Sequence, residues 1–317
     1  MGGGFALALM TALSARAPLF MVTGVAVGLA LPALAQAVRP AVVGVSILMV
    51  VLSMLRVDPG RLLAVLRRPM LVAGAAFLSL VVLPVLVAVL AAGAGAPPWL
   101  AAGLALAAAA PPLSSAAAFA ILVRIDPANV IAISLPATLV APATVWLVAQ
   151  TAPGLGEGVE ITALVLRLSA IILGAFGLAL VLRRVMGPTR IDGLARPLDA
   201  AMVVLMVVIG IGVMHDIGQA SRADPIAWAG IFLATWALGL ASLGLGVALF
   251  WPAGRDLAFA AGLCASIKNM AVMVAAVLDT VDPRIALVIV TAQLPIFVAP
   301  LVMRPLFAQL RRVGRQL

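Results

Sequence analysis

The chain has 317 residues, of which 65% are hydrophobic and only 10% are charged, and its mean hydropathy is +1.26. A soluble domain carries roughly a quarter charged residues, because water must solvate its surface. So few charges exclude a soluble globule and leave no room for a separate soluble domain. The sequence therefore predicts an all-α polytopic membrane protein, with residues 1–317 forming a single membrane domain in contact with the lipid bilayer.

The net charge of +9 does not indicate a nucleic-acid partner. The arginines stand in short runs between apolar segments, and the chain has no tyrosine and few other aromatic residues. With one cysteine and one histidine, it can form neither an internal disulfide nor a His/Cys metal cluster. It also lacks a phosphate-binding loop and a Ser-His-Asp pattern. We therefore expect no enzymatic activity, no cofactor and no metal site.

Ten apolar runs bounded by charge, glycine or proline predict ten transmembrane helices, since about 20 apolar residues cross a bilayer. In chain order, the predicted spans are residues 18–36, 38–56, 70–92, 98–122, 128–150, 160–182, 198–216, 226–251, 257–279 and 284–309. Residues 1–15 lack the basic start of a signal peptide, and we interpret them as a short leader into the first span, with a cleaved signal as the alternative.

The distribution of arginines predicts the orientation, because cytoplasmic loops are enriched in basic residues. With the N-terminus inside, fifteen arginines fall on the inner side and four on the outer side. The outer four are Arg39, Arg167, Arg222 and Arg284. Both termini are therefore predicted to be cytoplasmic, in the inner membrane of a bacterium.

Two segments half a chain apart resemble each other. Residues 124–144 read RIDPANVIAISLPATLVAPAT, and residues 280–302 read TVDPRIALVIVTAQLPIFVAPLV. Their Asp-Pro pairs begin at Asp126 and Asp282, which are 156 residues, or five predicted spans, apart. Because five is odd, the two halves cross the membrane in opposite senses, as in the inverted repeats of secondary transporters. The first repeat covers about residues 17–150 and the second about residues 160–309, with chance similarity as the alternative.

Two predicted spans are interrupted at equivalent places. In AAAAPPLSSAAA, the prolines 111 and 112 remove two backbone donors, and Ser114 and Ser115 can cap a helix that restarts after them. Adding 156 to Pro112 gives Lys268, within GLCASIKNMAVM in the ninth span. We expect helices 4 and 9 to be broken there. Substrate sites lie at such breaks, so Pro112, Ser114, Ser115 and Asn269 are the predicted substrate-binding residues.

Lys268 is the only lysine, and it lies at the centre of its predicted span. Each end of the span is roughly 16–20 Å away, too far for the side chain to reach water. A charge within the membrane is costly and indicates function. The alternative is that the span is misplaced and that Lys268 lies near an interface. Cys264 is one turn earlier and is predicted to face the same side, although buried cysteines are usually small hydrophobic residues.

These segments resemble the bile acid:sodium symporter superfamily over almost the whole chain, from about residue 17 to residue 307. The resemblance rests on GVSILMVVLSMLRVDPGRLLAVLRRP at residues 44–69, on PPLSSAAAFAILVRIDPANVIAISLPATLVAP at residues 111–142, and on CASIKNMAVMVAAV at residues 264–277. It implies ten helices in two domains: a panel of helices 1, 2, 6 and 7, and a core of helices 3–5 and 8–10 in which the broken helices cross.

The chain departs from the pattern of the sodium-binding members. Where they have a Ser-Asn pair, this chain has Ala116 and Ala117; where they have an acidic residue and a glutamine, it has Cys264 and Lys268. Other oxygen-bearing positions are kept, and these are Ser79, Ser114, Ser134 and Asn269. Without the carboxylate, and with an ammonium beside the site, sodium would lack its main ligand and be repelled. We therefore expect Lys268 to replace the sodium charge, bonded to Ser114, Ser134 or backbone carbonyls.

The sequence favours a secondary transporter of small organic anions that works by alternating access without sodium. One alternative is a sodium- or proton-coupled symporter of bile-acid-like or carboxylate substrates, with Lys268 as the proton carrier in one variant. A second is a metalloid-oxyanion efflux permease, although that branch is expected to have a cysteine at the fourth-helix break. A third is a membrane receptor that binds ligand without moving it. Substrate identity, direction of transport and oligomeric state do not follow from the sequence.

Overall fold

A computed structural model describes residues 16–55, 69–113, 116, 120, 125–151, 160–278 and 280–298. Within these ranges the regular secondary structure is helical, and six helices are long and apolar enough to cross a membrane. The shortest of the six have 24 residues, which span about 36 Å and exceed the ~30 Å hydrocarbon core of a bilayer. The protein therefore has the architecture of a polytopic membrane protein, as its composition predicts.

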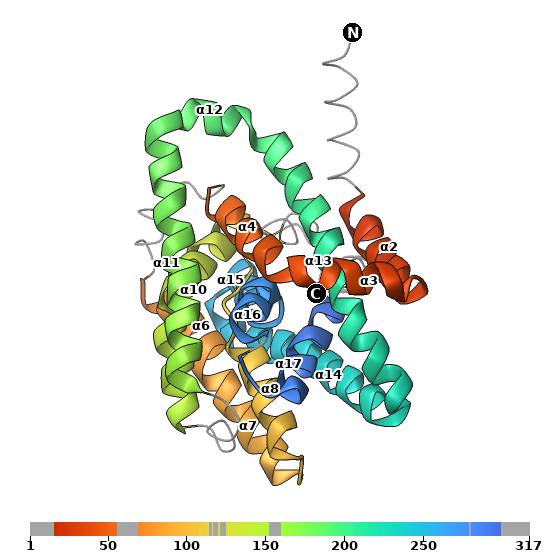
Figure 1. Cartoon of the computed structure of the whole chain (residues 1–317). Coiled ribbons are helices and arrows are strands. Elements are labelled where there is room, and N and C mark those ends of the chain that lie inside the picture. The colour runs from red at the N-terminus through yellow and green to blue at the C-terminus, as the bar shows by residue number, and fades with distance from the viewer. Residues whose placement is uncertain are drawn as a thin grey trace, which may run out of the picture.

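Long helices form the outer part of the molecule (Figure 1). Proline or glycine punctuates most of their ends, because proline fits the first helical turn and glycine ends a helix. The long helices are α3–η1–α4 (Pro32–Val38, Arg39–Ala41, Val42–Leu55), α6–η3–α7 (Pro69–Phe77, Leu78–Val82, Leu83–Gly93), α10 (Pro127–Thr151), α11 (Ile161–Met186), α13 (Ala195–Ala223) and α14 with η4 (Pro225–Phe250, Trp251–Ala253). The short helix α12 (Pro188–Gly193) joins α11 to α13 at one end of the molecule.

Shorter helices complete the fold: α2 (Ala17–Ala30), α8 (Pro98–Ala109), α15 (Arg255–Ser266), α16 (Met270–Val277) and α17 (Pro283–Thr291). Figure 1 shows α15 and α16 in the middle of the molecule, with α10 and α11 on one side and α13 and α14 on the other. Every residue of α16, and α8 from Ala101 onward, is buried. A helix that is apolar all round and enclosed in this way belongs to the core.

The first two predicted spans have the wrong boundary. We expected a helix over residues 18–36 and a second over residues 38–56, but α2 ends at Ala30 and the next helix begins at Pro32. Pro32 cannot donate a backbone hydrogen bond to the preceding turn, so α2 stops and the chain restarts with proline in its first turn. Hydropathy alone does not detect this boundary, because the residues on both sides of Pro32 are apolar.

The other long spans lie within a few residues of their predicted positions, except that α13 runs to Ala223, seven residues beyond the predicted end of the seventh span. The predicted interruptions occur where expected: α8 ends at Ala109, and α15 and α16 are separated at residues 267–269. Ser114, Ser115 and Ala117, together with the N-terminal leader and the end of the tenth span, lie outside the described residues.

Helices α14 and α15 pack at very short range through glycines. A Cβ atom added to Gly246 would lie 2.6 Å from the Gly262 Cα, and one added to Gly262 would lie 2.8 Å from the Leu243 carbonyl oxygen. Backbone atoms of two packed helices cannot move aside as a flexible side chain can. The two glycines therefore set how closely α14 approaches the central helices.

We expect Gly246→Ala to lower the melting temperature of the purified protein in detergent, because overpacking of a tight interface costs about 1–3 kcal/mol. Gly244→Ala on the same helix is the matched control, since a Cβ there meets no atom within 4 Å. Alanine favours the helix over glycine by up to ~1 kcal/mol, so the control is expected to melt at the same temperature or higher. Equal melting temperatures for the two variants would show that the interface tolerates the extra methyl group.

Candidate substrate and ion site

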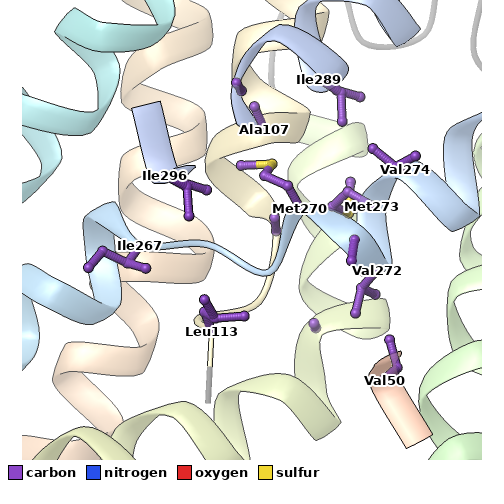
Figure 2. Close-up of a cluster of buried hydrophobic side chains, with 14 of the residues drawn as sticks. Val50, Ala107, Leu113, Ile267, Met270, Val272, Met273, Val274, Ile289 and Ile296 are labelled. Atoms are coloured by element: carbon purple, nitrogen blue, oxygen red, sulfur yellow. The ribbon is translucent and has the colours of Figure 1, made fainter. Parts of the chain in front are cut away.

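The ends of α8 and α15 meet as two short extended segments that run antiparallel. The Leu113 amide donates to the Ile267 carbonyl oxygen at 2.9 Å, and the Asn269 amide donates to the Pro111 carbonyl oxygen at 2.7 Å. These bonds flank an antiparallel bridge between Pro112 and Lys268. Figure 2 shows the crossing within the buried apolar cluster, with Leu113 on one segment and Ile267 and Met270 bordering the other.

The local sequence explains why α8 stops here. Pro111 and Pro112 lack amide hydrogens, so the helix that precedes them cannot continue through this point. The freed polar groups of the two extended segments then satisfy each other, as buried backbone groups must in the absence of water. The sequence thus converts two interrupted helices into one paired crossing.

Lys268 is buried at the crossing, with 3% of its surface exposed, so it does not lie at an interface with water. Its Nζ atom donates to the Ser79 carbonyl oxygen at 2.9 Å and lies 2.6 Å from the Ser79 hydroxyl oxygen. The Ser79 hydroxyl donates to the Cys264 carbonyl oxygen at 3.1 Å. The amine thereby connects the crossing to the helix α6–η3–α7.

Ser79 belongs to a π-helical turn, η3, at Leu78–Val82. Such π turns are rare, and they occur often at functional sites. Their hydrogen-bond spacing differs from that of an α-helix, so a backbone carbonyl group can bond outside the helix. The Ser79 carbonyl oxygen accepts from Lys268. The π turn therefore lies where the helix contacts the amine.

The predicted partners of Lys268 were partly wrong. A backbone carbonyl does accept from the amine, but Ser134 does not: its hydroxyl lies 3.5 Å from the Ile131 carbonyl oxygen, in its own helix α10. Ser79, which the resemblance placed among the oxygen-bearing positions, supplies both oxygens instead. Cys264 is fully buried beside the cluster, and its Sγ atom is 3.7 Å from the Val130 carbonyl oxygen.

A partly open pocket lies between the crossing and the helices α4 and α13. Its cavity volume is about 20 Å³, below the range of ligand pockets. The polar lining residues are Lys268, Asn269 and Gln293, and most of the others are apolar: Met49, Leu113, Met206, Ile209, Met270, Ala271, Ile296 and Phe297. The lining therefore offers a few polar groups in a mainly apolar space.

Two polar atoms of the pocket residues have no hydrogen-bond partner among the described residues: Asn269 Oδ1 and Gln293 Nε2. Both side chains are buried, with 1% and 3% of their surface exposed. An unpaired buried polar group costs about 1–3 kcal/mol, so native proteins rarely keep one without a reason. An acceptor and a donor left unpaired in one pocket indicate a ligand that presents both kinds of group, or that brings water with it.

Gln293 was not among the predicted site residues. It stands in the last apolar run of the chain, in VTAQLPIF, where an amide side chain is unusual. That signal was present in the sequence, but only the fold places Gln293 beside Asn269 and Lys268. Of the other predicted residues, Pro112 lies at the crossing, and Ala116 is buried and apolar.

Comparison of the sequence with protein-family models and with curated proteins finds no match in either. The class of protein therefore rests on the fold and the site: a polytopic helical membrane protein in which a lysine is buried at the crossing of two interrupted helices.

Proposed function

We propose that this chain is a secondary transporter of small organic anions, with two inverted five-helix repeats and no bound sodium. The observation that carries the proposal is the crossing itself. It holds a buried, hydrogen-bonded cation beside a pocket with unpaired amide groups. Interrupted helices near the middle of the membrane are where secondary transporters of this architecture bind their substrates.

The hydrogen bonds of the crossing support the inverted repeat. Adding 156 to Leu113 gives Asn269, and adding 156 to Pro111 gives Ile267, so exchanging the halves turns one interstrand bond into the other. The bridge joins Pro112 to Lys268, and adding 156 to Pro112 gives Lys268, so exchanging the halves leaves this bridge unchanged. Any antiparallel bridge has such a reciprocal pair of bonds, so the support for the repeat lies in the spacing: the bridged residues are 156 apart, as the two Asp-Pro pairs are.

Helix caps outside the crossing follow the same relation. Asp126 accepts from the amide two residues later, that of Ala128, at 2.9 Å, and Asp282 accepts from the amide of Arg284 at 2.8 Å. These bonds open α10 and α17 and are also related by 156 residues. The repeat thus extends from the paired break to the start of the following helix in each half.

Helix packing supports the repeat as well. The offset relates α2 to α11, α4 to α13, α7 to α14, α8 to α15 and α10 to α17. Under this offset, the pair α2–α13 corresponds to the pair α11–α4. The pair α7–α8 corresponds to α14–α15, and the pair α8–α17 corresponds to α15–α10. The helices of all six pairs are in contact. The contacts are therefore preserved when the halves are exchanged, as in a carrier with two equivalent gates.

Charge explains the preference for anions. The amine of Lys268 and the first turn of α16, which begins at Met270, both place positive potential at the pocket. Sodium would be repelled by the same charge, and Ser79, which could offer oxygen ligands, already bonds to the amine.

The proposal is tested by counterflow in proteoliposomes at pH 7.5, with radiolabelled lactate, isovalerate, benzoate and benzenesulfonate as probes. We expect saturable counterflow of at least one of these anions above protein-free liposomes, at the same rate when choline replaces sodium. The matched neutral amides are expected to compete poorly, because they lack the charge. Binding without counterflow would identify a receptor instead, and strict dependence on sodium would refute the proposed role of Lys268.

A further inference from the structure

Lys268 borders two pockets. The second lies among α8, α14 and residues 292–296, which follow α17, and its cavity volume is about 30 Å³. Its polar lining residues besides Lys268 are Thr235, Ser242 and Ser266. Small residues make room for it, and these are Ala107, Ala108, Gly239, Ala265 and Ala292.

Two of the three hydroxyl groups of this second pocket, those of Thr235 and Ser242, come from the otherwise apolar helix α14. Thr235, Gly239 and Ser242 recur at helical spacing along one face of α14. Thr235 and Ser242 are each 3% exposed, so this face points inward, although α14 is the least buried of the six long helices. The Thr235 hydroxyl donates to the Phe232 carbonyl oxygen at 2.8 Å, which leaves its oxygen free to accept.

This arrangement suits water. An internal water molecule needs a polar site with two to four hydrogen-bonding partners. The hydroxyl groups of Thr235, Ser242 and Ser266, which line one space together with Lys268, supply that number. The first pocket, in contrast, is lined mainly by large apolar side chains and the two unpaired amides. Lys268 thus lines both a mainly apolar pocket and a pocket suited to water.

The amine has no described counter-charge. Both of its hydrogen bonds go to Ser79 in η3, which is neutral. Among the described residues of the cluster, the only other titratable side chain is that of Cys264, from α15. The Val130 carbonyl oxygen of α10 lies 3.7 Å from the Cys264 Sγ atom, and the described pocket-lining residues other than Lys268 are uncharged. An ammonium in this setting is poorly compensated until an anion enters the first pocket.

We propose that Lys268 carries the coupling proton, that it binds this proton together with the anionic substrate, and that it exchanges the proton with water held in the α14 pocket. The inference rests on the proposed transport function and names its coupling ion. The chemistry is a simple proton transfer: a hydronium ion gives a proton to the amine, which becomes an ammonium, and water remains. On release, the anion leaves, and the ammonium returns its proton to water.

Thermodynamic linkage makes this coupling reciprocal. If the bound anion favours the protonated amine, then the protonated amine favours anion binding by the same factor. Proton and anion therefore cross together, and an inward proton gradient drives uptake. Exchange of labelled for unlabelled anion at equal pH does not require the proton to leave, so counterflow and gradient-driven uptake report different steps.

The first test measures protons directly. The four probe anions are added to the purified protein in weakly buffered detergent solution at pH 7.5, where all four are already ionised and cannot supply the signal. We expect uptake of up to one proton per anion bound by the wild type, and none by Lys268→Met. Anion binding without proton uptake would overturn the inference while leaving the proposed function intact.

The second test addresses the α14 pocket in proteoliposomes. Ser242→Ala is expected to slow proton-gradient-driven uptake at least threefold more than it slows counterflow of the same anion. Ser169→Ala is the matched control, since that hydroxyl bonds to the Val165 carbonyl within α11 and lines neither pocket; it is expected to change both rates equally. Equal slowing by Ser242→Ala would refute the role of the α14 pocket. If the wild type shows no counterflow at all, the transport function itself fails.

Discussion

Lys268→Met is expected to reduce anion transport at least tenfold while the purified protein melts at the same temperature as the wild type or higher. Methionine has nearly the volume and shape of the lysine stem, so the packing at the crossing is retained. What disappears is the cation and its two contacts with Ser79. Transport and stability are therefore expected to separate in this one variant.

The stability part of this prediction follows from the cost of burying a charge. Moving an amine into a protein interior costs free energy in either protonation state, several kcal/mol for the ammonium and less for the neutral form, and the hydrogen bonds to Ser79 offset only part of this cost. Replacing a buried charge by an apolar side chain of similar volume is consequently often neutral or stabilising. Had Lys268 served only to hold the fold, its loss would lower the melting temperature.

The transport part follows from the position of the amine. Lys268 borders the pocket and is the one cation in contact with the described crossing. A tenfold loss corresponds to about 1.4 kcal/mol, well within what one nearby charge contributes in a medium less polar than water. Lys268→Gln, which keeps a hydrogen-bond donor without the charge, is expected to lose transport as well.

Arg284→Gln is the matched control for charge. It also removes one cation, but Arg284 is largely exposed and bonds to Asp282 at 2.8 Å at the start of α17, away from both pockets. Its transport rate is expected to stay within twofold of the wild type. Wild-type transport by Lys268→Met, or a melting temperature that falls with the transport rate, would contradict a functional role for the amine.

The sequence predicted the local features of the site well, because they depend on neighbouring residues. Two adjacent prolines end a helix wherever they occur in it. Adding the 156-residue offset to this break then predicted a second break at Lys268. These inferences needed no knowledge of the other helices. The crossing of the two breaks was implied by the family resemblance, and the backbone pairing between them came only from the structure.

Contacts between distant helices were not predictable in the same way. Ser79 lies 189 residues from Lys268, and its carbonyl meets the amine at a π turn in an apolar helix. Ser134 was an equally reasonable partner by residue type, but its hydroxyl turns to its own helix. Likewise, the nearly uniform hydropathy of α14 does not reveal which of its faces points inward. The pocket beside Thr235 and Ser242 could therefore be identified only from the structure.

The second large effect is expected from Gln293→Leu, which should raise the dissociation constant of the transported anion roughly tenfold to a hundredfold. A hydrogen bond to a charged group is worth about 1.5–3 kcal/mol, and Gln293 Nε2 is a buried donor without a described partner. Binding of the probe anions by calorimetry measures the change. Leucine fills similar space, so the apolar part of the pocket is preserved.

Stability again distinguishes a binding role from a structural one. An unpaired buried amide destabilises the empty protein, so removing it is expected to leave the melting temperature unchanged or to raise it. Adding the anion is then expected to raise the melting temperature of the wild type more than that of Gln293→Leu, because a ligand stabilises in proportion to its affinity. Gln219→Leu is the matched control: this exposed glutamine on α13 lies 3.1 Å from His215 and lines neither pocket. If the two glutamine variants bind the anion equally well, the amide of Gln293 does not contact the substrate. The polar end of the anion must then bind to Asn269 and Lys268 alone.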